Sequence, residues 1–224
     1  MNDRLLSALI VVFSIFSTSF MNGQCENWIG KPTQSDAENA HSIYRQAMKA
    51  ADYTTAFEQW KIAYKLAPAA DGKRDYHYTD GIAIYKHLLT TTTDEKLKTE
   101  YKAEILKLYD QAINCYLAKS ISTKNGTEEE MKAKLGYLYG RKAYDMFYIL
   151  NSSYDDNIVA LDNSISYAGD KSEYIIMDPY ANIIVYEFKE GRMPKEKAVA
   201  LYKRLSDIAE YNIANNEKLS EGYQ

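Results

Sequence analysis

The chain alternates between stretches in which apolar residues recur every three or four positions and short polar stretches rich in Gly, Pro, Asn and Asp. Such spacing places apolar side chains on one face of an α-helix. The clearest stretch is 52–68, where Ala56, Trp60 and Ala63 share one stripe. Pro68 follows at a position where a helix should already have ended. The pattern predicts an all-α protein.

Residues that begin or end helices divide the chain into about eight helical segments. Ser35, Thr92 and Thr127 each stand three residues before a Glu, the spacing of a capping box. Gly169 and Gly191 stand where helices should stop. We expect helices over about 35–50, 52–67, 76–89, 92–118, 127–150, 155–167, 174–189 and 194–214.

Local signals conflict in the segment 174–189. Its isoleucines, such as Ile183, favour a β-strand in isolation. Asp178 and Pro179, however, suit the first turn of a helix, and Gly191 suits the residue after its end. We therefore expect a helix, and no strand anywhere in the chain.

The stretch 40–68 resembles a tetratricopeptide repeat in the spacing of its alanines, aromatic residue and proline. In that family, antiparallel helices cross closely at small residues, and aromatic residues fill the holes between neighbouring pairs. The resemblance assigns the small contacts to Ala56 and Ala63, the filling to Trp60 and the helix end to Pro68. It implies a right-handed solenoid of stacked antiparallel helical hairpins.

A looser match to the repeat lies in 191–205. Ala198 and Tyr202 stand there where Ala56 and Trp60 stand in the first pair of helices. An ordinary helix bundle is the alternative, and only a repeat array predicts an open groove. No shift in composition divides the array, so we expect one helical-repeat domain over 35–224, preceded by an irregular lead-in over 24–34.

The first residues have the pattern of an export signal. Arg4 supplies a positive start, 5–16 is almost entirely apolar, and 17–23 is mostly small and polar. The apolar run is shorter than the roughly 20 residues that a membrane span requires. We expect 1–23 to be a cleaved signal peptide and the mature chain to have no permanent membrane span.

Two cysteines follow the signal. Cys25 stands where a bacterial lipoprotein carries its lipid, but such signals place a small residue before the cysteine and this chain has Gln24. We therefore do not expect lipidation at Cys25. An exported protein could join Cys25 to Cys115, yet their separation predicts nothing without geometry. The simpler expectation is two free or conditionally paired thiols.

Composition excludes some partners. The net charge is −4 and the Lys and Arg residues are scattered, which argues against a nucleic-acid partner. The chain has 21 Tyr against 6 Phe and 2 Trp. A phenol can bury its ring and keep its hydroxyl at an edge, so the excess suits half-covered helix interfaces or a tyrosine-lined groove for a peptide or a glycan.

The sequence shows no catalytic pattern. No two of the histidines His41, His77 and His87 lie three or four residues apart, so no helix carries a zinc pair, and we expect each in a groove or on the surface. Phosphate-binding loops, nucleophile elbows and calcium loops are also absent from the sequence. We expect no catalytic residue, metal or cofactor, and hence not an enzyme.

The resemblance places partner-contacting residues on the first helix of a pair. In this chain they are Glu38, His41, Arg45, Met48 and Lys49. The chain is similar in style to exported tetratricopeptide-repeat proteins of Bacteroidetes. We expect an exported scaffold, in the periplasm or at the outer membrane, that binds a protein or peptide and helps to assemble a cell-envelope complex. The alternative is a glycan-binding protein of the outer surface.

Overall fold

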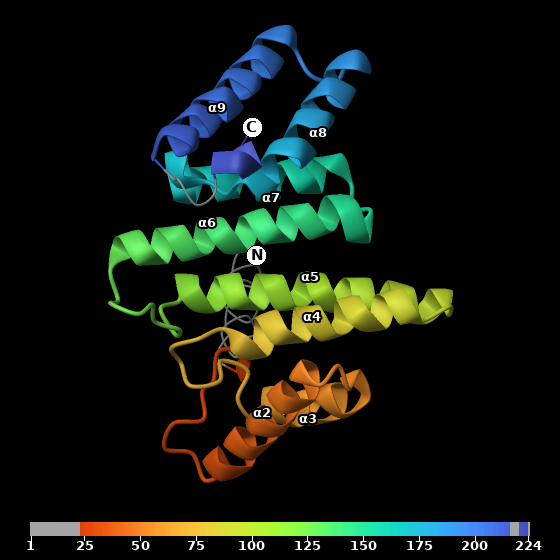
Figure 1. The fold of residues 1–224 in the computed structure, drawn as a ribbon, viewed down its shortest axis with the longest axis vertical. Coiled ribbons are helices and arrows are strands. Elements are labelled where there is room, and N and C mark those ends of the chain that lie inside the picture. The colour runs from red at the N-terminus through yellow and green to blue at the C-terminus, as the bar shows by residue number, and fades with distance from the viewer. Residues whose placement is uncertain (1–22, 216–219, 224) are drawn as a thin grey trace, which may run out of the picture. The chain divides into compact units, whose positions relative to one another are not determined.

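The computed structural model describes residues 23–215 and 220–223, and every regular element in these ranges is helical (Figure 1). The predictions of an all-α fold and of a helix over 174–189 are confirmed. The predicted signal peptide, apart from Gly23, lies outside the described residues. The α-helices are α2 (Gln34–Lys49), α3 (Tyr53–Leu66), α4 (Tyr76–Thr91), α5 (Glu95–Leu117), α6 (Glu128–Asp145), α7 (Tyr154–Ala168), α8 (Met177–Lys189) and α9 (Lys195–Asn215). Shorter helical turns are η1 (Met146–Leu150), η2 (Gly169–Lys171), η3 (Tyr174–Ile176) and η4 (Ser220–Tyr223).

The chain forms two compact units, which divide between Lys124 and Asn125. The division coincides with a turn in which Gly126 has a φ of +69°, a conformation that glycine adopts without strain. Each unit is a self-contained set of helices and is described by itself. One continuous array of four hairpins stays a prediction.

The first unit consists of two helical hairpins, α2 with α3 and α4 with α5, joined by contacts between α3 and α4 (Figure 1). Ala56 and Ala63 are fully buried where the helices meet. The indole N–H of Trp60 donates to the backbone oxygen of His77, at 2.6 Å. The Trp60 ring also occupies the space that a Cβ at Gly81 would need, which explains a glycine inside α4.

The irregular lead-in is attached to this unit by a disulfide between Cys25 and Cys115, whose Cα atoms are 5.4 Å apart. The expectation of free thiols is therefore wrong. The backbone N–H of Trp28 donates to the oxygen of Ala70, at 2.9 Å, and the N–H of Ala69 donates to the oxygen of Glu26, at 2.9 Å. These bonds place the lead-in beside the turn after α3.

Two of the three predicted capping boxes are wrong. Helix α2 begins at Gln34, one residue before Ser35, so Ser35 does not cap it. Asp94, rather than Thr92, accepts hydrogen bonds from the first backbone N–H groups of α5. Thr127 does accept from the N–H of Glu130, at 3.2 Å. A carboxylate next to the helix start competes with a hydroxyl, because both can accept the same unpaired N–H groups.

The second unit contains the hairpin of α6 with α7 and the pair α8 with α9 (Figure 1). Helices α6 and α7 cross at small residues: a Cβ at Gly136 would lie 2.6 Å from the Cβ of Ala168. The hydroxyl of Ser164 donates to the oxygen of Gly136, at 2.8 Å. On α9, Ala198 is buried, but Tyr202 is 67% exposed and does not fill a hole as Trp60 does.

Helix α6 widens at its end into the π-helical turn η1. The buried Asn157 of α7 lies against this turn. With its amide oriented so that both neighbouring backbone groups are satisfied, its nitrogen donates to the oxygen of Ala143, at 3.3 Å, and its oxygen accepts from the N–H of Phe147, at 3.1 Å. In a regular α-helix these two backbone groups would bond to each other, so Asn157 takes the place of one helical hydrogen bond.

Candidate functional site

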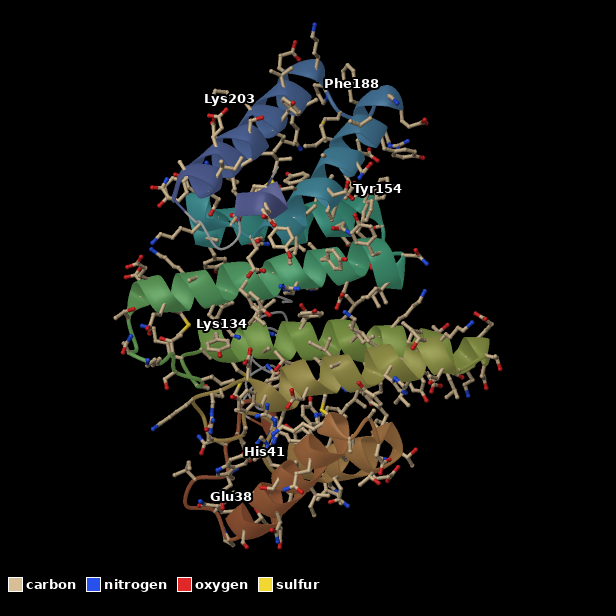
Figure 2. The ribbon with its side chains drawn as sticks, viewed as in Figure 1. Glu38, His41, Lys134, Tyr154, Phe188 and Lys203 are labelled. Atoms are coloured by element: carbon tan, nitrogen blue, oxygen red, sulfur yellow. A yellow bond between two sulfur atoms is a disulfide. The ribbon has the colours of Figure 1, made fainter. Side chains whose placement is uncertain are left out.

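The residues expected to contact a partner all belong to α2, and Figure 2 labels two of them, Glu38 and His41. Glu38 is exposed and accepts a hydrogen bond from the side chain of Gln34, at 2.7 Å. Lys49 is also exposed, and Met48 is half-buried. These three side chains lie on the outside of the hairpin or at its margin.

Arg45 is held in a network with α4. Its Nε lies 3.5 Å from a carboxylate oxygen of Asp80, and its guanidinium lies 4.0 Å from the ring centre of Tyr76. The guanidinium of Arg74 lies 4.9 Å from the same ring. Hydrogen bonds from Arg45 and Arg74 lower the pKa of the Tyr76 hydroxyl. Tyr44 donates to Asp80, at 2.9 Å, and burial raises the pKa of that carboxyl.

His41 continues this network into the interior. Its Nδ1 lies 2.9 Å from Nε2 of His77, and Nδ1 of His77 lies 2.6 Å from the backbone oxygen of Ala67. Because the carbonyl can only accept, His77 donates from Nδ1 and accepts at Nε2, and His41 donates from Nδ1. Burial lowers the pKa of each imidazole to about 4.

His77 is fully buried, so its expected place in a groove or on the surface is wrong. A search for histidines three or four residues apart cannot find a pair that two helices bring together. The network as a whole joins α2 to α4 and balances the positive charge of Arg45 with Asp80. Of the predicted contact residues, His41 and Arg45 therefore have structural partners.

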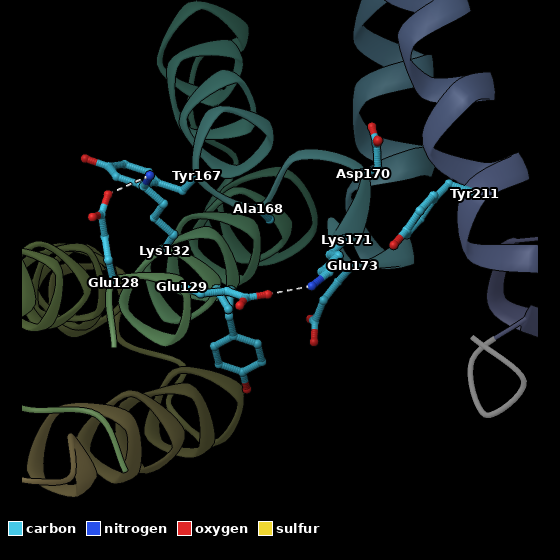
Figure 3. Close-up of a pocket in the computed structure, with 11 residues that line it drawn as sticks. Glu128, Glu129, Lys132, Tyr167, Ala168, Asp170, Lys171, Glu173 and Tyr211 are labelled. Atoms are coloured by element: carbon cyan, nitrogen blue, oxygen red, sulfur yellow. Dashed lines mark hydrogen bonds and ion pairs between the residues drawn. The ribbon is translucent and has the colours of Figure 1, made fainter. Parts of the chain in front are cut away.

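The second unit contains a cleft of about 760 Å³ (Figure 3). It lies where the start of α6, the end of α7, η2 and α9 meet. Three tyrosine rings and six charged side chains supply most of its surface. The lining residues are Glu128, Glu129, Lys132, Ala133, Tyr137, Tyr167, Ala168, Asp170, Lys171, Glu173 and Tyr211.

The charges of the cleft are paired. The ammonium of Lys132 lies 2.7 Å from a carboxylate oxygen of Glu128, and that of Lys171 lies 2.7 Å from one of Glu129 (Figure 3). Glu173 is 3.4 Å from Nε of Arg141, and burial raises the pKa of this carboxyl. Asp170 likewise lies 2.5 Å from a guanidinium nitrogen of Arg204. The lining has four acidic and two basic side chains, and the two further cations, Arg141 and Arg204, lie just outside it.

The tyrosines of the cleft come from three helices. Tyr137 on α6 has the ammonium of Lys134 5.0 Å from its ring centre. Tyr167 on α7 stacks on Tyr139, with ring centres 5.7 Å apart. Tyr211 reaches the cleft from α9. Sequence reasoning did not place this site, because its residues come from distant parts of the chain; the excess of tyrosine, which suits a tyrosine-lined groove, was the available signal.

Other features bear on the kind of site. Within residues 23–215 and 220–223, no group of three or more His, Cys, Asp or Glu side chains could hold a metal ion. No helix in the same ranges combines the length and apolar character that crossing a membrane requires. Comparison with protein-family models, curated proteins and solved structures found no match.

Proposed function

We propose that this protein is an exported, non-enzymatic binding protein that holds a segment of a partner protein in the cleft of its second unit. The observation that supports this most directly is a cleft of about 760 Å³ lined by Tyr137, Tyr167 and Tyr211 and by paired charges. Its volume falls in the range of about 300 to 1,000 Å³ typical of binding pockets. The scaffold would serve assembly of a cell-envelope complex.

The lining suits a polypeptide. Tyrosine offers a large contact area at a low cost in side-chain entropy, and its hydroxyl can bond to a peptide group. The pairs of Glu128 with Lys132 and Glu129 with Lys171 hold donors and acceptors at the margin of the cleft. A peptide with acidic and basic side chains can exchange partners with such pairs without leaving a charge unpaired.

The disulfide supports export. Disulfides form and persist in oxidising compartments and are rare where thiols are kept reduced. The sulfur of Cys25 is bonded to Cys115, so it is not available for the thioether of a lipid anchor. Together with the apolar pattern of 1–23, this supports a periplasmic protein, or one associated with the outer membrane without a lipid at Cys25.

A tetratricopeptide-like arrangement is part of the same proposal. Close helix crossings at small residues occur in both units, at Ala56 and Ala63 and again at Gly136 and Ala168. Such crossings allow hairpins to pack side by side and leave a surface for a partner.

Site-specific photo-crosslinking tests this function. A p-benzoylphenylalanine residue replaces Tyr211 in the cleft or, as a matched control on the same helix, the exposed Tyr202. After irradiation of cells, mass spectrometry identifies covalent partners. We expect one recurrent protein partner from position 211 and none from position 202. Equal capture at both positions, or no adduct at 211, would contradict the proposal.

A further inference from the structure

A row of aromatic side chains lies at the end of the second unit where α6 passes through η1 to α7. It consists of Tyr144, Phe147, Tyr148, Tyr154 and Tyr186, and is called the aromatic strip here. Ring centres are 4.7 Å apart for Tyr144 and Tyr148, and 4.9 Å for Phe147 and Tyr148. They are 6.1 Å apart for Phe147 and Tyr154, and 5.1 Å for Tyr154 and Tyr186. The rings form one continuous series.

The strip combines exposure with fixed positions. Tyr148 and Tyr186 are each 46% exposed, although both contact other rings of the strip. Asn157 holds the π-helical turn that carries Phe147, and the hydroxyl of Tyr148 donates to Asp178. The rings are therefore presented to solvent in a prepared geometry, which lowers the entropic cost of binding.

A small cleft of about 390 Å³ adjoins the strip at Tyr154 and Tyr186, and Figure 2 labels Tyr154 at the start of α7. Its other lining residues are Ser153, Asp155, Glu187 and Arg192. Arg192 binds the largely buried Glu187 through two hydrogen bonds, of 2.8 and 2.9 Å. Its guanidinium also lies 5.1 Å from the ring centre of Tyr186.

We propose that the aromatic strip and this cleft bind a neutral oligosaccharide. The C–H face of a sugar ring is apolar and flat, so it can stack on tyrosine rings, while each sugar hydroxyl both donates and accepts. Glu187 and Arg192 provide an acceptor and donors side by side, and Ser153 adds a hydroxyl. This site is separate from the cleft of the proposed function.

Charge and hydrogen bonding select this ligand over two others. The guanidinium of Arg192 is already paired with Glu187, and Asp155 adds a second carboxylate to the lining, so the cleft has no positive excess that would attract an anionic ligand. A proline-rich peptide can also pack on aromatic rings, but proline has no N–H to donate to Glu187 or Asp155. A polyhydroxylated ligand uses both the rings and the polar groups.

Isothermal titration calorimetry with four neutral hexaoses, namely maltohexaose, cellohexaose, mannohexaose and xylohexaose, tests the proposal. We expect at least one to bind the purified protein. Tyr186→Ala should weaken that binding about tenfold or more, whereas Tyr186→Phe, which keeps the ring, should retain it. Tyr202→Ala, which removes an exposed tyrosine outside the strip, serves as the matched control and should bind as the wild type does.

Arg192→Gln provides an independent test, since this side chain is half-exposed and contributes hydrogen-bond donors, not an aromatic ring, to the site. We expect about tenfold weaker binding of the same hexaose, with unchanged helical content by circular dichroism. Binding of none of the four hexaoses would overturn the proposal. Equal losses of binding in Tyr186→Ala and Tyr202→Ala, or unchanged binding in Arg192→Gln, would overturn it as well. So would a result in which poly-L-proline, and not a hexaose, binds at Tyr186.

Discussion

At the scale of residues, tyrosine links neighbouring helices. Tyr44 on α2 donates to Asp80 on α4, and Tyr180 on α8 donates to Asp162 on α7. In both cases the ring is fully buried and the hydroxyl reaches a carboxylate at the edge of the core. Burial of the phenol is the main reason that the pKa of Tyr180 is raised. Helix packing thus accounts for part of the excess of tyrosine, and the two clefts account for another part.

The histidine pair predicts a dependence of stability on pH. In the folded protein the pKa values of His41 and His77 are lowered to about 4, against an ordinary value of 6.5. Their contribution to the free energy of unfolding is therefore complete above pH 6.5 and is lost as the pH falls toward 4. Arg45 and Arg74 oppose a proton on His41, whereas Asp71 favours it.

Urea unfolding at pH values from 7 to 4 measures this effect. We expect His41→Gln to lose less stability than the wild type over this range, because it removes one of the coupled groups. His87→Gln is the matched control and should keep the slope of the wild type, since His87 lies outside the pair and stacks on Tyr53. Identical slopes in all three proteins would show that the pair does not cause the dependence.

At the scale of elements, contacts between helices override local helix propensity. Gly81 lowers the intrinsic stability of α4 by about 1 kcal/mol relative to alanine. Its missing Cβ nevertheless leaves space for the Trp60 ring, which could not remain in place beside an alanine. The conflict between propensity and packing is decided in favour of packing.

Gly81→Ala should therefore destabilise the first unit by about 1 to 3 kcal/mol, despite the gain in helix propensity. Chemical denaturation followed by tryptophan fluorescence measures the change. The smaller ring in Trp60→Phe should reduce the additional cost of Gly81→Ala. Stabilisation by Gly81→Ala in the wild-type background would contradict the close contact between ring and helix.

Asn157 maintains the π-helical turn by replacing a helical hydrogen bond. Asn157→Leu should cost about 1 to 3 kcal/mol, because the oxygen of Ala143 and the N–H of Phe147 would lose their side-chain partner. Faster hydrogen exchange at Phe147 should accompany the loss. The matched control on the same helix is Asn163→Leu, which removes an amide bonded only to its own helix and should change stability by less than about 0.5 kcal/mol. Equal effects of the two substitutions would exclude this role.

At the scale of the whole molecule, the disulfide lies entirely within the first of the two units. It joins residues separated by 90 positions, and a loop of that size corresponds to about 4 to 5 kcal/mol in the chain-entropy model. Trp28 and Trp60 are the two tryptophans of the chain, and both belong to this unit. Their fluorescence therefore reports on the first unit alone.

Replacing both cysteines, Cys25 and Cys115, by alanine should lower the unfolding midpoint seen by tryptophan fluorescence. A second transition, seen by circular dichroism and assigned to the second unit, should stay where it is. Dithiothreitol should shift the wild type in the same direction and leave the double variant unchanged. A shift of both transitions by the same amount would refute independent stabilisation of the first unit.

Much of the secondary structure was predictable from local pattern. Apolar residues at helical spacing, with Pro68, Gly169 and Gly191 at the ends, predicted to within a few residues the α-helices α2 to α9 of the part of the chain that the structure describes. This worked because such spacing reports which side of a helix is buried, and because proline and glycine limit a helix through their own backbone geometry. The capping residues were less predictable, since Asp94 and Thr92 stand two residues apart and both types of side chain can accept from the unpaired N–H groups at a helix start.

Tertiary structure alone decided which surfaces meet. The pairing of Cys25 with Cys115, the contact of His41 with His77 and the approach of Tyr211 to the α6 cleft all join distant parts of the chain. A periodic pattern shows that one face of a helix is covered, but it does not show which other helix covers it. The helices were determined locally, whereas the disulfide, the buried histidines and both clefts depend on how those helices pack.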